Sequence, residues 1–218
     1  EMQGTKREEL SMELVKLNVG SFLFNELTID NNDLESYAIM MFRTLDAMEV
    51  YNVPLRRIQV FVQRVRFSYL ENPFHNFKHG FFVFRIAFKI VSEIKGFNPI
   101  MFSPEECLGM LIASLATDIG HLGRTNAFEV ENQSELAIRY NDISVYENMS
   151  AATLFQILKD DRADILGTMR SLKRKLVRKI IITCILRTDP DLKESFIDLL
   201  GKKKLVLKEL GTLGAEDK

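Results

Sequence analysis

The sequence predicts an all-α protein. Apolar residues recur three and four positions apart through most of the 218 residues, which is the spacing of one helix face. Aspartate, serine or proline stands immediately before several of these segments, as is typical of helix starts. No stretch alternates polar and apolar residues for more than a few positions, and no internal repeat or low-complexity linker interrupts the chain.

The first half contains three predicted helices. Residues 34–50 have helical apolar spacing, and Asp33 is well placed as their N-cap. Pro54 opens residues 55–70, because the fixed φ of proline suits a first helical turn. Residues 76–95 form the third helix, which is rich in phenylalanine between positions 77 and 88. We interpret these phenylalanines as core packing.

The second half begins with a clear helix start. Ser103 supplies a hydroxyl cap, Pro104 follows it, and two acids occupy the first turn, so a helix is expected from there to about residue 117. A loop with three turn-forming residues, Gly120, Gly123 and Asn126, is expected over 118–131. The remaining predicted elements are helices over 134–140, 145–159, 171–188 and about 192–200, and a lysine-rich tail over 202–218.

Composition narrows the class of function. The chain is 46% hydrophobic and 27% charged with a net charge of −1, so no overall field favours nucleic acid or an anionic membrane. No apolar run reaches the roughly 20 residues that a membrane-spanning helix needs. Cys107 and Cys184 are expected to be buried free thiols in a reducing compartment rather than a disulfide. We therefore expect an intracellular protein, cytoplasmic or cytoskeleton-associated, and a fragment or processed form because residue 1 is glutamate.

The three histidines occupy two short stretches. His75 and His79 are four residues apart and share one face of a helix, while Asp118 and His121 are three apart. Imidazole nitrogens and a carboxylate suit a zinc-type ion, and Gly120 would let the backbone turn tightly beside it. The same residues could instead be a hydrogen-bonded cluster that ties two helices together, because a His-x-x-x-His pair on an aromatic-rich helix often arises by chance. The basic run at 173–179 could be a solvated face or a partner-docking surface.

Four segments resemble one family in register. NPFHNFKHGFFV and TDIGHLGRTN resemble the His-Asn-x-x-His and His-Asp-x-Asp-His-x-Gly-x-x-Asn motifs of class I 3′,5′-cyclic nucleotide phosphodiesterases. SELAIRYNDISVYEN resembles the segment that normally ends Leu-Glu-Asn-His-His, and CILRTD resembles the helix ending Ile-Leu-Ala-Thr-Asp. The resemblance covers about residues 20–200, and its third segment is most similar to the high-affinity cGMP-specific class.

The resemblance implies a fold and a chemistry. The family's catalytic domain is all-helical and has three subdomains, of which this chain would contain the first two as one incomplete domain over 1–218. Its zinc and magnesium ions activate a hydroxide that attacks the cyclic phosphate. By position, His75 matches the general acid, His79 matches a zinc ligand and Asp118 matches the carboxylate that touches both metals. His121, Asn126 and Glu147 match positions that support the ligands and organise water.

The chain departs from the family's pattern at four internal positions. Thr117 stands where the family has a histidine zinc ligand, and Gly120 replaces the second acid of its motif. Met149 and Ser150 replace the two histidines after Glu147-Asn148. The chain also ends before the segment that supplies the last aspartate ligand and the purine pocket. Of four zinc ligands, only His79 and Asp118 remain, and a threonine hydroxyl is a poor substitute for imidazole.

We therefore predict a phosphodiesterase-like pseudoenzyme that acts as a scaffold or interaction module for protein partners in a larger assembly. No cofactor is expected in this chain under that hypothesis. The alternative is an active cyclic nucleotide phosphodiesterase, seen as a fragment, with zinc and magnesium bound and cGMP or cAMP as substrate. A non-catalytic nucleotide sensor is a weaker alternative, because most of its purine pocket would come from the missing segment.

Overall fold

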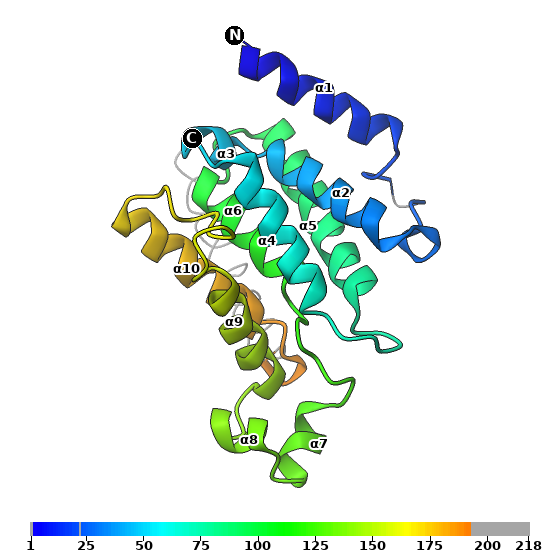
Figure 1. The fold of residues 1–218 in the computed structure, drawn as a ribbon, viewed down its shortest axis with the longest axis vertical. Helices are drawn as coiled ribbons and strands as arrows, with labels where there is room; N and C mark the ends of the chain where they lie inside the picture. Colours follow the sequence, from blue (N-terminus) through cyan, green and yellow to red (C-terminus); the bar gives the residue numbers. More distant parts are fainter. Residues whose placement is uncertain (1, 22, 193–218) are drawn as a thin grey trace, which may run out of the picture. The chain divides into compact units, whose positions relative to one another are not determined.

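The computed structural model describes residues 2–21 and 23–192, and all regular structure in these ranges is helical. This confirms the predicted all-α class. Figure 1 shows α5 and α6 in the middle of the helical part of the chain, where α6 packs against α5 and α10. The elements are α1 (Met2–Lys16), a 3-10 turn (Glu26–Thr28), α2 (Asn31–Arg43), α3 (Asp46–Val50), α4 (Leu55–Phe67), α5 (Phe77–Phe97), α6 (Pro104–Leu115), α7 (Asn126–Glu131), α8 (Glu135–Tyr140), α9 (Val145–Ile157), α10 (Ser171–Leu186) and a second 3-10 turn (Pro190–Leu192).

The helix starts that depend on capping chemistry are confirmed. At α6, the Ser103 hydroxyl accepts from the Glu106 backbone N–H, and the Glu106 carboxylate accepts from the Ser103 N–H at 2.8 Å. At α5, the Asn76 side chain accepts from the N–H groups of Lys78 and His79. Pro54 immediately precedes α4, as predicted. Side-chain caps therefore fix the first turn of α5, which carries His79, and the first turn of α6, which precedes Asp118.

The predicted helix over 34–50 is wrong as a single element. It is two helices, α2 and α3, and α2 is capped by Asp30 rather than by Asp33. The Thr44 hydroxyl donates to the Met41 carbonyl at 2.7 Å, and the next residue, Leu45, is extended. A hydroxyl that bonds the backbone competes with the helical ladder, and apolar periodicity does not register this interruption.

Three further expectations change. Residues 126–131, expected in a loop, form α7, which begins at the Thr125 cap. The helix α1 lies in a segment for which no element was predicted, and α4 ends at Phe67 rather than at residue 70. The predicted last helix and the tail fall almost wholly outside the described residues. Cys107 is a buried free thiol as expected, but Cys184, also free, is only half-buried.

Aromatic rings build the centre of the core. Phe42 of α2 stacks on Phe84 of α5 at 5.0 Å between ring centroids and meets Phe61 of α4 edge to face at 5.9 Å. Burying such a ring contributes about 1.5–3 kcal/mol relative to exposure. Between 77 and 88, Phe77, Phe81 and Phe84 are buried, which confirms core packing for them, whereas Phe82 is 42% exposed.

The α6 helix packs directly against α5, α3 and α10. It approaches α10 closely at Gly109, where an added Cβ would lie 2.7 Å from the Ile180 Cγ2 atom. Its first turn is also tied to its neighbours by Glu105, a carboxylate 3% exposed that bonds the Tyr51 hydroxyl and the Lys173 ammonium. No helix of the described ranges is both long and apolar enough to cross a membrane.

Glu105 makes folding stability depend on acid pH. Burial opposes ionisation, but the Lys173 ammonium and the Tyr51 hydroxyl outweigh it and lower the pKa of Glu105 from 4.5 to about 2. The ionised Glu105 carboxylate therefore stabilises the native state. This contribution to the free energy of unfolding is complete above about pH 4.5 and is lost as the pH falls towards 2. We expect Glu105→Gln to be less stable at pH 7 and to flatten the loss of stability between pH 5 and 2, as measured by urea unfolding.

Candidate functional site

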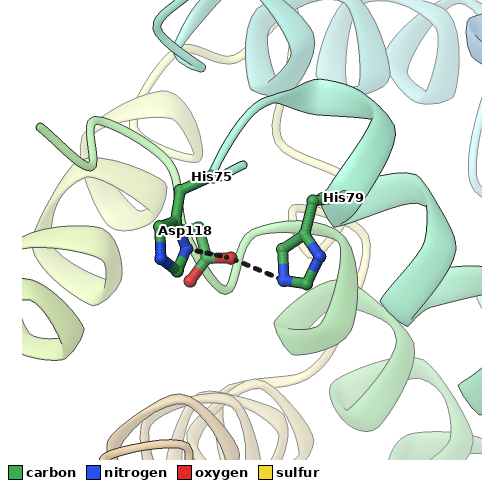
Figure 2. A group of neighbouring side chains, drawn as sticks. All are labelled: His75, His79 and Asp118. Carbon is green, nitrogen blue, oxygen red and sulfur yellow. Dashed lines mark ion pairs between the residues drawn. The ribbon is translucent and has the colours of Figure 1, made fainter. Parts of the chain in front are cut away.

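Three of the predicted site residues meet at one point. His75 lies just before α5, His79 lies in the first turn of α5, and Asp118 follows the end of α6 (Figure 2). The Asp118 Oδ2 atom lies 3.3 Å from His75 Nδ1 and 3.2 Å from His79 Nε2. One ligand atom from each residue lies within 4.8 Å of the other two. The structure thus brings together residues more than 35 positions apart in the sequence.

Local structure explains how these side chains converge. The Asn76 cap begins α5 between the two histidines, so His79 is helical while His75 remains in the preceding turn. The direct packing of α5 against α6 then places Asp118 opposite both rings. The predicted helical i, i+4 pair is therefore replaced by a cap-and-first-turn arrangement, which still aims both imidazoles at one carboxylate.

The cluster is partly shielded from solvent. Burial would raise the pKa of Asp118, but the two facing imidazoles outweigh this effect and hold it below its usual value. Asp118 is therefore a carboxylate at neutral pH. Although the contacts are short, neither His75 Nδ1 nor Asp118 Oδ2 has a partner with good hydrogen-bond geometry. A carboxylate oxygen and an imidazole nitrogen thus remain buried with unused bonding capacity.

His121 joins the cluster through ring stacking. It stacks on His75 at 3.8 Å between centroids and on Tyr146 at 4.1 Å, with interplanar angles of 21° and 23°. Its Nδ1 atom accepts from the Gly123 N–H at 2.9 Å. Burial and the neighbouring His75 lower the pKa of His121 to about 4, so the ring is neutral at pH 7. His121 therefore packs as an uncharged aromatic ring between two others.

Tyr146 is the participant that sequence reasoning missed. Its hydroxyl donates to the Glu129 carboxylate at 2.5 Å, and both residues are buried. The signal in the sequence was the tyrosine itself, because the family motif that this segment resembles has leucine at this position. Helix α9, which begins at Val145, places this ring against His121. Glu129 lies in α7, the helix that was expected to be a loop, so its position could not be anticipated.

Asn126 and Glu147 meet beside this stack. The Asn126 side chain donates to the Glu147 carboxylate at 2.9 Å and accepts from the Tyr146 backbone N–H at 3.0 Å. Asn126 therefore satisfies a backbone donor at the start of α9 and fixes that helix against the first residue of α7. Both predicted residues thus lie next to the histidine stack rather than within the His75–His79–Asp118 cluster.

Three of the four departure positions carry side chains, and the fourth is a glycine. Ser150 is fully buried, and its hydroxyl donates to the Ile119 carbonyl at 3.1 Å. Thr117 is 6% exposed. Gly120 has φ +79°, and a Cβ there would lie 3.2 Å from the Met149 Cε atom. A side chain at position 120 would therefore meet both backbone strain and the methionine, whose methyl group lies over the glycine.

The donor set fits a metal only in part. Two imidazole nitrogens and one carboxylate oxygen are ligands that zinc accepts, and their unused bonding capacity is consistent with an ion. However, three of the positions that depart from the family motif hold a buried hydroxyl already bonded to a carbonyl, a glycine and a thioether. No further imidazole or carboxylate among the described residues joins the group.

Comparison with known proteins identifies the family. The sequence profile described as 3′5′-cyclic nucleotide phosphodiesterase matches residues 74–209. The chain is 30% identical over 168 residues to the 3′,5′-cyclic-nucleotide phosphodiesterase regA of Dictyostelium discoideum, covering 76% of this chain and 21% of that protein. It is 32% identical to the high affinity cGMP-specific 3′,5′-cyclic phosphodiesterase 9A of Drosophila melanogaster, covering 68% of this chain and 10% of that one.

Solved structures of phosphodiesterase domains are also similar to this chain. The crystal structure of the phosphodiesterase domain of the RhoPDE fusion protein from Salpingoeca rosetta superposes with a TM-score of 0.81 and 30% identity, over 86% of this chain and 59% of that domain's chain. The chain thus spans less than two thirds of the relatives it matches. The matched segments include the histidine stretches and the helices that position them. The chain therefore belongs to the 3′,5′-cyclic nucleotide phosphodiesterase family.

Proposed function

We propose that this chain is a phosphodiesterase-like domain that has lost its metal centre and serves as a scaffold or interaction module in a larger intracellular assembly, cytoplasmic or cytoskeleton-associated. One observation carries the proposal. At positions where the family motif has acidic or histidine side chains, Ser150 is buried and bonded to a carbonyl and Met149 lies over Gly120. Packing of this kind preserves the helical shell without supplying ligands.

The loss of ligands bears directly on catalysis. A catalytic zinc site normally has three protein ligands and lowers the pKa of its bound water to about 7. Without that ion, water remains close to its free pKa, and hydroxide is scarce at neutral pH. Thr117 cannot replace an imidazole, because a neutral hydroxyl is a much weaker donor to zinc. Under this proposal, His75, His79 and Asp118 hold the start of α5 against the segment that follows α6.

A second candidate function is favoured by a different observation. Ligand atoms of His75, His79 and Asp118 lie within 4.8 Å of one another, and two of these residues have buried atoms without a good hydrogen bond. If this group held zinc, with magnesium beside it, and further ligands came from a longer chain, the protein could hydrolyse cGMP or cAMP. The similarity to the high affinity cGMP-specific 3′,5′-cyclic phosphodiesterase 9A of Drosophila melanogaster and to the 3′,5′-cyclic-nucleotide phosphodiesterase regA supports a cyclic nucleotide as substrate under this alternative.

A hydrolysis assay separates the two functions. The purified chain is incubated with cGMP and, separately, cAMP in the presence of zinc and magnesium, and nucleotide loss is followed by chromatography. We expect the same rate as for His79→Ala, since no hydroxide-generating centre remains to be removed. Hydrolysis that exceeds the His79→Ala rate and disappears when metals are chelated would establish the alternative instead.

A further inference from the structure

A groove of about 470 Å³ lies between α9 and α10, away from the histidine cluster. Its floor is apolar and is formed by Ala151, Ala152, Phe155, Leu158, Leu166 and Ile182. Three cationic side chains line it as well: Lys159, Arg174 and Arg178. The described lining contains no carboxylate. The groove therefore combines an apolar surface with positive charge, although the whole chain has a net charge of −1.

The positive charge is concentrated in this part of the sequence. Between residues 165 and 186 there is no aspartate or glutamate, whereas six lysines and arginines occur there: Arg170, Lys173, Arg174, Lys175, Arg178 and Lys179. Two acids that precede this segment are already engaged. Asp164 pairs with Arg174 at 2.7 Å, and Asp160 pairs with Arg162 at 2.8 Å as well as with Arg64. Because Asp164 offsets the charge of Arg174, the remaining positive charge of the groove lining comes from Lys159 and Arg178.

The two arginines present an ordered surface. They are four residues apart on α10 and so share one face of the helix. The Arg178 guanidinium carbon lies 3.8 Å from the centroid of the Phe155 ring, so the planar group stacks on the floor of the groove. A guanidinium stacked in this way keeps its N–H donors in the plane of the group, where a carboxylate can accept from two of them.

We propose that the α9–α10 groove binds an acidic segment of a partner protein that also carries an apolar side chain. Carboxylates would pair with Arg178 and Lys159, and the apolar side chain would cover Phe155 and Ala152. Inorganic phosphate or a nucleic acid backbone would use the charge but would leave the apolar floor exposed. The proposal goes beyond the proposed function, because the groove shares no residue with the His75–His79–Asp118 cluster.

The test is fluorescence anisotropy with the full chain and a fluorescein-labelled peptide in which glutamates alternate with leucine and phenylalanine. We expect saturable binding that is weakened about tenfold by Arg178→Glu and by Lys159→Glu. Ala152→Trp, which fills the exposed floor without changing charge, is expected to weaken it similarly. The matched control is Lys179→Glu, which makes the same charge change on α10 outside the groove and should have a much smaller effect.

Several outcomes would overturn the groove proposal. These are absence of saturable binding, equal weakening by Lys179→Glu and Arg178→Glu, equally tight binding of an all-glutamate peptide, or equally tight binding of single-stranded DNA. The same preparations are assayed for zinc. Because zinc uptake reports on the histidine cluster and anisotropy reports on the groove, either proposal can fail while the other holds.

Discussion

Restoring a histidine at position 117 is expected to raise the affinity of the chain for zinc about 100-fold. Thr117 adjoins Asp118 and stands where the family's motif supplies an imidazole ligand, so Thr117→His would add a third ligand to His79 and Asp118. The free energy of zinc binding to four-ligand structural sites is roughly 10–16 kcal/mol. One added ligand therefore corresponds to about two orders of magnitude in zinc affinity. Competition with a chromophoric zinc chelator measures the change.

The control for this gain is Thr117→Val, which keeps the size and burial of the side chain but offers no donor atom. Its zinc affinity should equal that of the unaltered chain. If Thr117→His bound zinc no better than Thr117→Val, the missing imidazole would not be what disables the site, and the ligand argument would fail. Thermal unfolding of both variants without zinc shows whether the larger ring has disturbed the end of α6.

Replacing Arg85 by leucine is expected to lower the free energy of unfolding by about 3–5 kcal/mol. Arg85 of α5 is 2% exposed, and its guanidinium donates to the Ser21 carbonyl at 2.8 Å and to the Val19 carbonyl at 3.3 Å. It also pairs with Glu26 at 3.4 Å. The leucine variant would leave the buried Glu26 carboxylate without this cation. Urea unfolding followed by circular dichroism measures the loss.

A double variant tests the cause. Because Glu26→Met removes the carboxylate that Arg85→Leu leaves unpaired, the Glu26→Met/Arg85→Leu chain should be more stable than Arg85→Leu alone. A single variant that lost less than about 1 kcal/mol would show that Arg85 does not hold the segment before α2 against α5. If the loss of stability in the double variant equalled the sum of the losses in the two single variants, the two charges would not stabilise each other.

The fold was predictable where one local signal decided it. Pro54 fixes the backbone φ immediately before α4, and the hydroxyl-proline-acid start of α6 satisfies backbone donors within a few residues, so each signal lies in the local sequence. The predicted helix over 34–50 failed because the Thr44 hydroxyl bonds the Met41 carbonyl, a choice that apolar spacing does not reveal. The helix α7 was missed because glycines before it suggested a loop, while its Thr125 cap was overlooked.

The candidate site was predictable to the extent that it rests on histidine and aspartate. Spacing paired His75 with His79, and the family resemblance implied that Asp118 joins them; the structure brings the three together, although a cap rather than one helical turn positions the two histidines. The stack of Tyr146 on His121 was not predictable, because it depends on how α7 and α9 pack. Likewise, only the structure shows that Met149 lies over Gly120. These two departures from the family motif are therefore in contact with each other.

The most direct test of the account is the zinc content of the purified chain. After dialysis against micromolar zinc, elemental analysis gives the zinc bound per chain for the unaltered protein and for His79→Ala. We expect equal, substoichiometric values, because too few ligands remain to hold the ion. One zinc per unaltered chain that disappears in His79→Ala would contradict the loss of the metal centre and would make the active phosphodiesterase the better description.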